Sequence, residues 1–105
     1  MSSYILKLYV RTEASAKTKK NLFSALMTGP KGWVLKEIVD VTAHPEKAAE
    51  AEVMVTPCLD IEHDGKSFRL IGDFSTDEEV RRLLAIFEEQ HGDAASETET
   101  DDSGN

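Results

Sequence analysis

The stretch CLDIEHDGKSFRLI, residues 58–71, decides the fold of this chain of 105 residues. Apolar and charged side chains alternate over residues 59–62, which is the pattern of a strand with one buried face. Asp64 and Gly65 follow, and this dipeptide favours a type I′ turn because both central residues of that turn have positive φ. Residues 67–71 then return as the partner strand, so the stretch predicts an antiparallel hairpin.

After the hairpin, the sequence predicts a turn and a helix. Gly72 and Asp73 interrupt the strand pattern. Ser75 and Glu78 are spaced as a capping box, in which each side chain accepts a hydrogen bond from the other residue's backbone N–H. Gly92 is the expected end of this helix. The apolar residues expected in the core of this part are Phe74, Val80, Leu83, Leu84 and Phe87.

The part of the chain before the hairpin predicts two strands and two helices. The segment Tyr4–Val10 is nearly continuously apolar, as a central strand buried on both faces would be. We expect a helix over residues 14–28, a second strand over 33–41 and a short helix over 45–52, with Pro45 at its first position. The apolar stripe expected to bury the first helix consists of Leu22, Phe23, Leu26 and Met27.

The full order is therefore βαβαββα. A parallel pair with a right-handed crossover, then a hairpin and a covering helix, define an α/β fold with a mixed sheet and helices on both faces. This arrangement resembles the thioredoxin-like fold. Residues 1–91 are expected to form this one domain.

Residues 92–105 differ in composition from the rest of the chain. They contain no Lys, no Arg and no large apolar residue, and they carry five acidic residues in a chain of net charge −8. We expect a disordered acidic tail, because such a segment cannot bury enough apolar surface to offset its ordering entropy. The tail has two possible roles, to keep the protein soluble or to dock to a basic partner. Its negative charge argues against nucleic acid and anionic membranes as partners.

The single cysteine, Cys58, excludes an intrachain disulfide and fits a reducing cytosol. No basic and apolar leader precedes the first strand, and the apolar run interrupted by Lys7 is far too short to span a bilayer. We therefore expect a cytoplasmic protein outside the membrane.

The site that a thioredoxin-like fold usually carries is missing from the sequence. Oxidoreductases of this fold place Cys-x-x-Cys after the first strand, where a helix N-terminus lowers the thiol pKa. Residues 11–17 read RTEASAK and hold no cysteine, so we expect no disulfide exchange of that kind, no enzyme activity and no cofactor. Thr56 and Pro57 match the cis-proline loop of the fold. Cys58 beside them has two interpretations, a buried apolar residue or a reactive thiol.

Other chemical sites find little support. The three histidines, His44, His63 and His91, lie far apart without cysteine pairs, so no metal site is expected. Acidic candidates are Glu13, Asp40 and Asp73, but no pair of them is marked as a general acid and base.

Four stretches carry a family resemblance through their order and spacing. They are YILKLYV (Tyr4–Val10), VDV at 39–41 with Pro45 after it, VTPCL at 55–59 and RLIGDFS at 69–75. Together they resemble the KaiB family of circadian clock proteins. The resemblance implies a non-catalytic protein that binds the ring-forming ATPase KaiC or a KaiC-like ATPase. It also implies competition with a KaiC-binding histidine kinase that carries a similar domain.

The resemblance further implies two folds, a tetrameric ground state with a rearranged second half and a thioredoxin-like monomer that binds the ATPase. KaiB proteins of cyanobacteria that have a clock usually carry a proline-containing linker at the position of residues 62–66. They also usually carry helix-weakening residues at the position of residues 83–85. Here both segments favour the hairpin and the last helix, so we predict mainly the thioredoxin-like monomer, with a homo-oligomer as the alternative. The residues in the region that a switch would rearrange are Asp64, Gly65, Gly72 and Asp73.

The expected partner contacts lie at the open end of the first strand and on the helix after it. They are Lys7, Arg11, Lys17 and Lys20. Lys7 has an equal alternative as a strand residue whose amine simply reaches solvent.

Two other functions stay open. One is a thioredoxin-type peptide-binding domain unrelated to a clock, which would use the loop at Thr56 and Pro57 and an exposed sheet edge. The other is a one-cysteine redox protein that uses Cys58.

Overall fold

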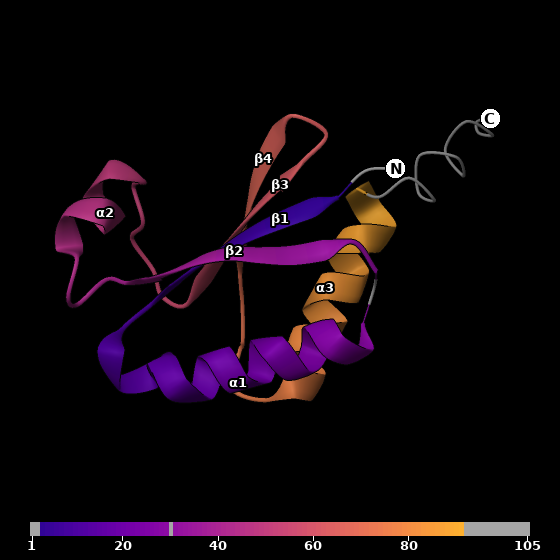
Figure 1. Ribbon diagram of the computed structural model, residues 1–105, viewed down its shortest axis with the longest axis horizontal. Helices are drawn as coiled ribbons and strands as arrows, with labels where there is room; N and C mark the ends of the chain where they lie inside the picture. The colour runs from indigo at the N-terminus through magenta and orange to yellow at the C-terminus, as the bar shows by residue number, and fades with distance from the viewer. Residues whose placement is uncertain (1–2, 30, 92–105) are drawn as a thin grey trace.

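The computed structural model describes residues 3–29 and 31–91, and these residues form four strands and three helices (Figure 1). The elements in chain order are β1 (Tyr4–Val10), α1 (Thr12–Thr28), β2 (Trp33–Asp40), α2 (Pro45–Glu50), β3 (Cys58–His63), β4 (Lys66–Ile71) and α3 (Asp77–His91). The predicted order βαβαββα is confirmed. The acidic tail and the expected helix end at Gly92 lie outside the described residues.

The strands form one mixed sheet in the order β2-β1-β3-β4. β1 pairs in parallel with β2 and antiparallel with β3, and β3 pairs antiparallel with β4. The central place of β1 follows from its sequence, because a strand with neighbours on both edges and cover on both faces needs apolar residues at nearly every position.

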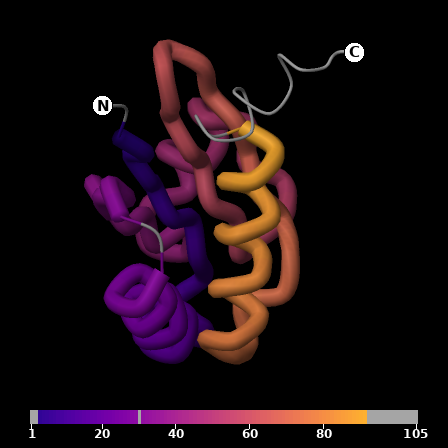
Figure 2. Tube along the Cα trace, turned by 90° about the vertical axis from the view of Figure 1, so that its right-hand side faces the viewer, coloured from indigo at the N-terminus to yellow at the C-terminus, as the bar shows by residue number. Residues whose placement is uncertain are grey.

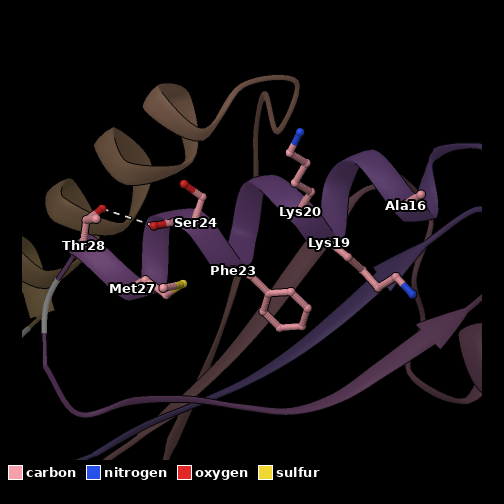
Figure 3. Close-up of a pocket in the computed structure, with 7 residues that line it drawn as sticks. All are labelled: Ala16, Lys19, Lys20, Phe23, Ser24, Met27 and Thr28. Carbon is pink, nitrogen blue, oxygen red and sulfur yellow. Dashed lines mark hydrogen bonds between the residues drawn. The ribbon is translucent and has the colours of Figure 1, made fainter.

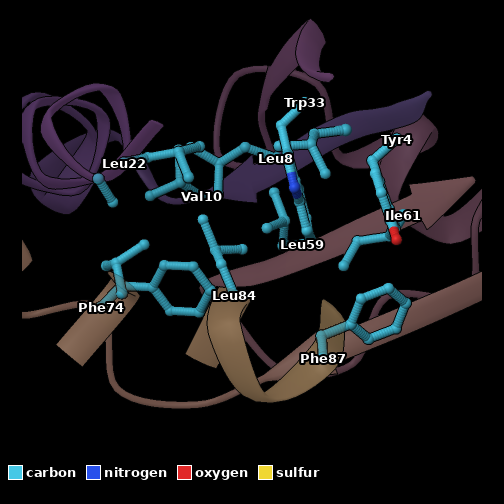
Figure 4. Packing of buried hydrophobic residues seen from close by; sticks show 13 residues of the cluster. Tyr4, Leu8, Val10, Leu22, Trp33, Leu59, Ile61, Phe74, Leu84 and Phe87 are labelled. Atoms are coloured by element: carbon cyan, nitrogen blue, oxygen red, sulfur yellow. The ribbon is translucent and has the colours of Figure 1, made fainter. Parts of the chain in front are cut away.

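Two helices cover one face of the sheet. Figure 2 shows α1 nearly end-on beside the lower part of α3, and the two helices pack on each other. Leu84 and Phe87 of α3 point toward buried strand residues such as Leu59 and Ile61 (Figure 4). Thirteen buried residues of the described part of the chain form this core, and burying one large apolar side chain contributes about 1.5–3 kcal/mol to stability.

The opposite face is covered much less. Helix α2 lies on this side and buries none of its residues. A small second cluster, Tyr9, Val39 and Cys58, is packed there against Ala51 and Val53. The predicted helices on both faces are thus present, but the second face keeps a wide open area.

An aromatic stack closes the end of the core near the start of β1. The Tyr4 ring lies 4.3 Å from the Trp33 ring and 3.9 Å from the His63 ring, and all three are nearly parallel. Phe87 meets Tyr4 and Trp33 edge-on at 6.3 and 6.1 Å. The stack therefore joins β1, β2 and β3 to α3.

The predicted hairpin is confirmed. Asp64 and Gly65 have φ of 55° and 75°, as the type I′ turn requires. The register pairs Cys58 with Ile71 and His63 with Lys66.

The predicted burial of the first helix is wrong at two positions. Phe23 is 46% exposed and Met27 is 85% exposed. The buried residues of α1 are instead Thr18, Leu22 and Ala25, with Leu26 partly buried. These residues form the stripe that faces the sheet and α3, which leaves Phe23 and Met27 on the solvent side.

The predicted capping box is displaced by one residue. The Thr76 hydroxyl accepts a hydrogen bond from the backbone N–H of Glu79 at 3.1 Å, so Thr76 is the N-cap of α3. The N–H of Ser75 donates instead to the carboxylate of Asp73 at 2.9 Å. The same Ser/Thr-x-x-Glu spacing occurs at both positions, and the turn at Asp73 selects the second.

We expect Thr76→Ala to lower the free energy of unfolding by about 1 kcal/mol, because it leaves a helix N–H without its acceptor. Ser75→Ala should cost clearly less. Urea denaturation followed by circular dichroism measures both variants. A larger loss from Ser75→Ala would place the cap at Ser75.

Candidate functional site

The candidate site lies at the end of the sheet where β1 stops and α1 begins, at the left of Figure 1. A hollow of about 320 Å³ lies there between the start of α1 and the segment before β3. Its lining residues are Arg11, Val41, Thr42, Ala48, Val53, Met54 and Thr56. The structure thus brings the predicted contact Arg11 and the predicted Thr56 loop into one surface. Arg11 also pairs with Glu13 at 2.9 Å.

Asp40 holds this end of the sheet together. Its carboxylate accepts hydrogen bonds from the Thr12 hydroxyl at 2.6 and 2.8 Å and from the N–H groups of Thr42 and Ala43 at 3.0 and 3.2 Å. The Thr12 bond, together with the two N–H bonds, lowers the pKa of Asp40 below its usual range. This acidic candidate therefore has a structural role, as a charged acceptor that joins α1 to the loop after β2.

We expect Asp40→Ala to lower the melting temperature at neutral pH. Because the pKa of Asp40 is lowered in the folded state, its contribution is present above the unfolded pKa and is lost as pH falls through the folded pKa. The melting temperatures of wild type and variant should therefore converge in acid. A difference that is constant from pH 7 down to pH ~2 would contradict the role of the charge.

The loop before β3 presents apolar side chains to solvent. The peptide bond between Thr56 and Pro57 is cis. Met54 is 91% exposed and Val55 is 51% exposed. Met54 lines the hollow, so exposed apolar surface adjoins it on this side.

Cys58 lies behind this loop and is fully buried. Burial raises the pKa of its thiol, so the thiolate needed for nucleophilic chemistry is disfavoured at neutral pH. Of the two interpretations of this residue, the geometry favours the buried apolar one.

An open surface runs along the outer face of α1 and includes the side chains drawn in Figure 3. Phe23 and Lys19 point to one side of the helix there, and Lys20 and Ser24 point to the other. Within the described residues, Lys19 and Lys20 take part in no ion pair. This face therefore combines exposed apolar area with cations that have no acidic partner in the described part of the chain.

Lys17 lies on the side of α1 that faces the loop between β4 and α3. Asn21 donates a hydrogen bond to the carbonyl of Phe74 in that loop at 2.9 Å. Hydrogen bonds from Ser75, together with the charges of Lys17 and Arg82, lower the pKa of Asp73. The loop is thus held against α1 near two of the predicted contacts, Lys17 and Lys20.

Lys7 lies apart from the other predicted contacts. It projects from the middle of β1 on the open face of the sheet, where its amine pairs with Glu37 at 3.4 Å and lies 5.6 Å from the centre of the Tyr9 ring. Arg11, Lys17 and Lys20 instead follow β1 along α1.

The residues predicted to lie in the region that a fold switch would rearrange occupy two separate parts of the structure. Asp64 and Gly65 are the hairpin tip, at the end of the sheet opposite to Arg11. Gly72 and Asp73 lie in the loop before α3, and a Cβ at Gly72 would come within 2.8 Å of the Leu83 side chain. A side chain at position 72 would therefore require the Leu83 side chain to shift.

The described residues hold no group of three His, Cys, Asp or Glu side chains that could bind a metal ion. His63 is buried against the Tyr4 ring, and the exposed His91 lies over the Phe87 ring. Over residues 3–29 and 31–91, none of the helices has the length and apolar composition needed to cross a membrane.

Sequence reasoning missed Met54, Val55, Phe23 and Met27 as surface residues. A signal existed for the first two, because the apolar run ends at Thr56 and Pro57, and a proline cannot continue a paired central strand. For Phe23 and Met27 the helical period was correct, but it did not tell which side of a broad apolar stripe faces the sheet.

The fold and the site define a thioredoxin-like domain without the two active-site cysteines. The structure is similar to the germline-specific thioredoxin Deadhead of Drosophila melanogaster, with a TM-score of 0.59 and 13% identity over 80% of each chain. It is also similar to the N-terminal domain of SasA from Synechococcus elongatus, with a TM-score of 0.53 and 20% identity over 85% of this chain and 86% of that one. No protein-family model matches the chain.

The sequence relatives identify the family. The chain is 34% identical to the circadian clock oscillator protein KaiB of Thermostichus vulcanus over 97 residues, which cover 90% of both chains. It is 35% identical to KaiB of Picosynechococcus over 90 residues, 84% of this chain and 86% of the other. The chain belongs to the KaiB family.

Proposed function

We propose that this chain is a non-catalytic regulator that binds a KaiC-like ring ATPase through the end of the sheet at Arg11 and the adjacent face of α1. The observation that carries the proposal is the combination of exposed apolar side chains, Met54 and Val55, with cations on α1, at the place where thioredoxin-like enzymes carry their cysteines. Membership of the KaiB family supports the choice of partner.

The charges suggest what the partner surface looks like. The chain is acidic overall, yet α1 carries Lys17, Lys19 and Lys20 against Glu13, which is paired with Arg11. Complementary charge steers association and fixes orientation, while apolar residues supply most of the affinity. The ATPase surface that fits is therefore acidic with an apolar centre.

The test is co-elution of the full chain with the KaiC-like ATPase from the same genome, in ATP and in ADP. We expect one complex whose amount depends on the nucleotide. A folded chain that elutes apart from the ring in both nucleotides would contradict the proposal.

A second function is favoured by the loop at Thr56 and Pro57, which follows the exposed Met54 and Val55: it would accept an extended peptide, as in other proteins of this fold. A peptide array tests this alternative. It is supported if the chain does not bind the ring, binds peptides on the array, and loses that peptide binding in the Met54→Ser variant.

We also propose that the thioredoxin-like monomer is the main state in solution. Backbone NMR and light scattering test it. A dominant state with helix over residues 53–66 or strand over 83–88, or a tetrameric mass, would overturn it.

A further inference from the structure

Arg69 of β4 makes an unusual set of contacts on the open face of the sheet. Its guanidinium donates to both carboxylate oxygens of Asp60, the residue opposite it on β3, at 2.7 and 2.9 Å. The same group donates to the carbonyl of Glu52 at 2.9 Å and to that of Ala51 at 2.8 Å. One side chain thus joins the hairpin to the end of α2 and to the segment that leads to the candidate site.

Besides Arg69, the ion pair of Lys47 with Glu37 at 3.3 Å and the packing of Ala51 and Val53 hold α2 and the segment after it on the sheet. Helix α2 has six residues and buries none of them, and isolated helices of this length are unstable in water. Ala51 is the C-cap of α2, and Glu52 follows with a φ of 58°. A cation at the C-terminal end of a helix is favoured by the helix dipole and by the free carbonyls there.

The same segment covers Cys58. Ala51 and Val53 pack against the cluster of Tyr9, Val39 and Cys58, in which the cysteine is fully buried. Movement of the segment away from the sheet would therefore expose the thiol while the main core, on the other face, stays closed.

We propose that Arg69 is a positioning residue, a latch that holds residues 51–57 on the sheet and thereby fixes Met54 and Val55 for a partner. Its importance for partner binding rests on the proposed function. The latch itself is independent of any partner, because the contacts that define it lie within the chain.

The test uses Cys58 as a built-in reporter. The rate at which an aromatic disulfide reagent labels Cys58 in the full chain measures how often the segment opens. Arg69→Gln should raise this rate at least about tenfold, because the loss of a single hydrogen bond to a charged group corresponds to roughly this factor. Arg82→Gln, which removes an exposed ion pair with Glu79 on α3, is the matched control and should change the rate less than about twofold.

Two measurements distinguish a latch from an ordinary cross-strand ion pair and from global unfolding. Asp60→Asn removes the charge opposite Arg69 but leaves the two carbonyl bonds, so it should accelerate labelling much less than Arg69→Gln. Equal acceleration by the two variants would mean that only the ion pair matters and would overturn the latch. The equilibrium constant of global unfolding is measured for wild type and Arg69→Gln by Trp33 fluorescence in urea. If the labelling rate rises by no more than this constant does, labelling reports global unfolding and the latch is overturned as well.

If Arg69→Gln does not fold, Arg69→Lys carries the same comparison, since a lysine amine cannot reproduce the forked contacts. Wild-type labelling rates in a folded Arg69→Lys would then overturn the latch. Because labelling needs no partner, failure of ring binding leaves the result on the latch unchanged.

Discussion

Replacing Phe87 by alanine should lower the free energy of unfolding by about 3–5 kcal/mol, which is a large part of the stability of a domain of this size. Phe87 is 6% exposed, and its ring meets the edges of the Tyr4, Trp33 and Phe68 rings at 6.3, 6.1 and 5.2 Å. Truncation leaves a cavity among rigid rings that cannot collapse to fill it.

The neighbouring Ile86 offers a matched control, because it lies on the same helix and is 45% exposed. Ile86→Ala should cost less than about 1 kcal/mol. Urea denaturation followed by Trp33 fluorescence measures both. Equal losses would mean that α3 packs on the sheet through another face.

Reversal of two charges on α1 should abolish most partner binding. The variant Lys17→Glu, Lys20→Glu is expected to weaken the complex with the KaiC-like ring at least about tenfold, because it places like charge against an acidic surface. The fold should persist, since acidic residues in the first half of a helix are compatible with its dipole.

The control is Lys36→Glu, Lys66→Glu, which changes the net charge by the same amount at exposed lysines on β2 and at the hairpin tip. We expect near wild-type affinity for it, measured by titration at fixed salt. Equal weakening by both variants would show that only net charge matters, and no weakening by the first would move the contact away from α1.

Much of the fold could be predicted because its signals are local. The alternation before Asp64 and Gly65 and the turn chemistry of that pair determine the hairpin within a few residues. The continuous apolar run of β1 likewise predicts its central place. The predicted cap of α3 was wrong by one residue, because Ser75 and Thr76 each have a glutamate three residues later. Only the turn at Asp73 determines which of the two caps the helix.

The candidate site was less predictable because its contacts are distant in sequence. The carbonyls that Arg69 contacts lie 17 and 18 residues away, in a loop whose path depends on the sheet. The separation of Lys7 from Arg11 follows from strand alternation, which puts Lys7 and Tyr9 on one face, while Arg11 lies beyond the strand end.

The stacked rings of Tyr4, Trp33 and His63 have an optical consequence. Trp33 is the single tryptophan, so its near-ultraviolet circular dichroism reports on this one place in the molecule. The contact of Tyr4 with Trp33 lies within the first half of the chain, whereas His63 belongs to the second half. A rearrangement confined to the second half would thus remove the His63 side of the stack and keep the Trp33 side, and the Trp33 spectrum would report it without any added label.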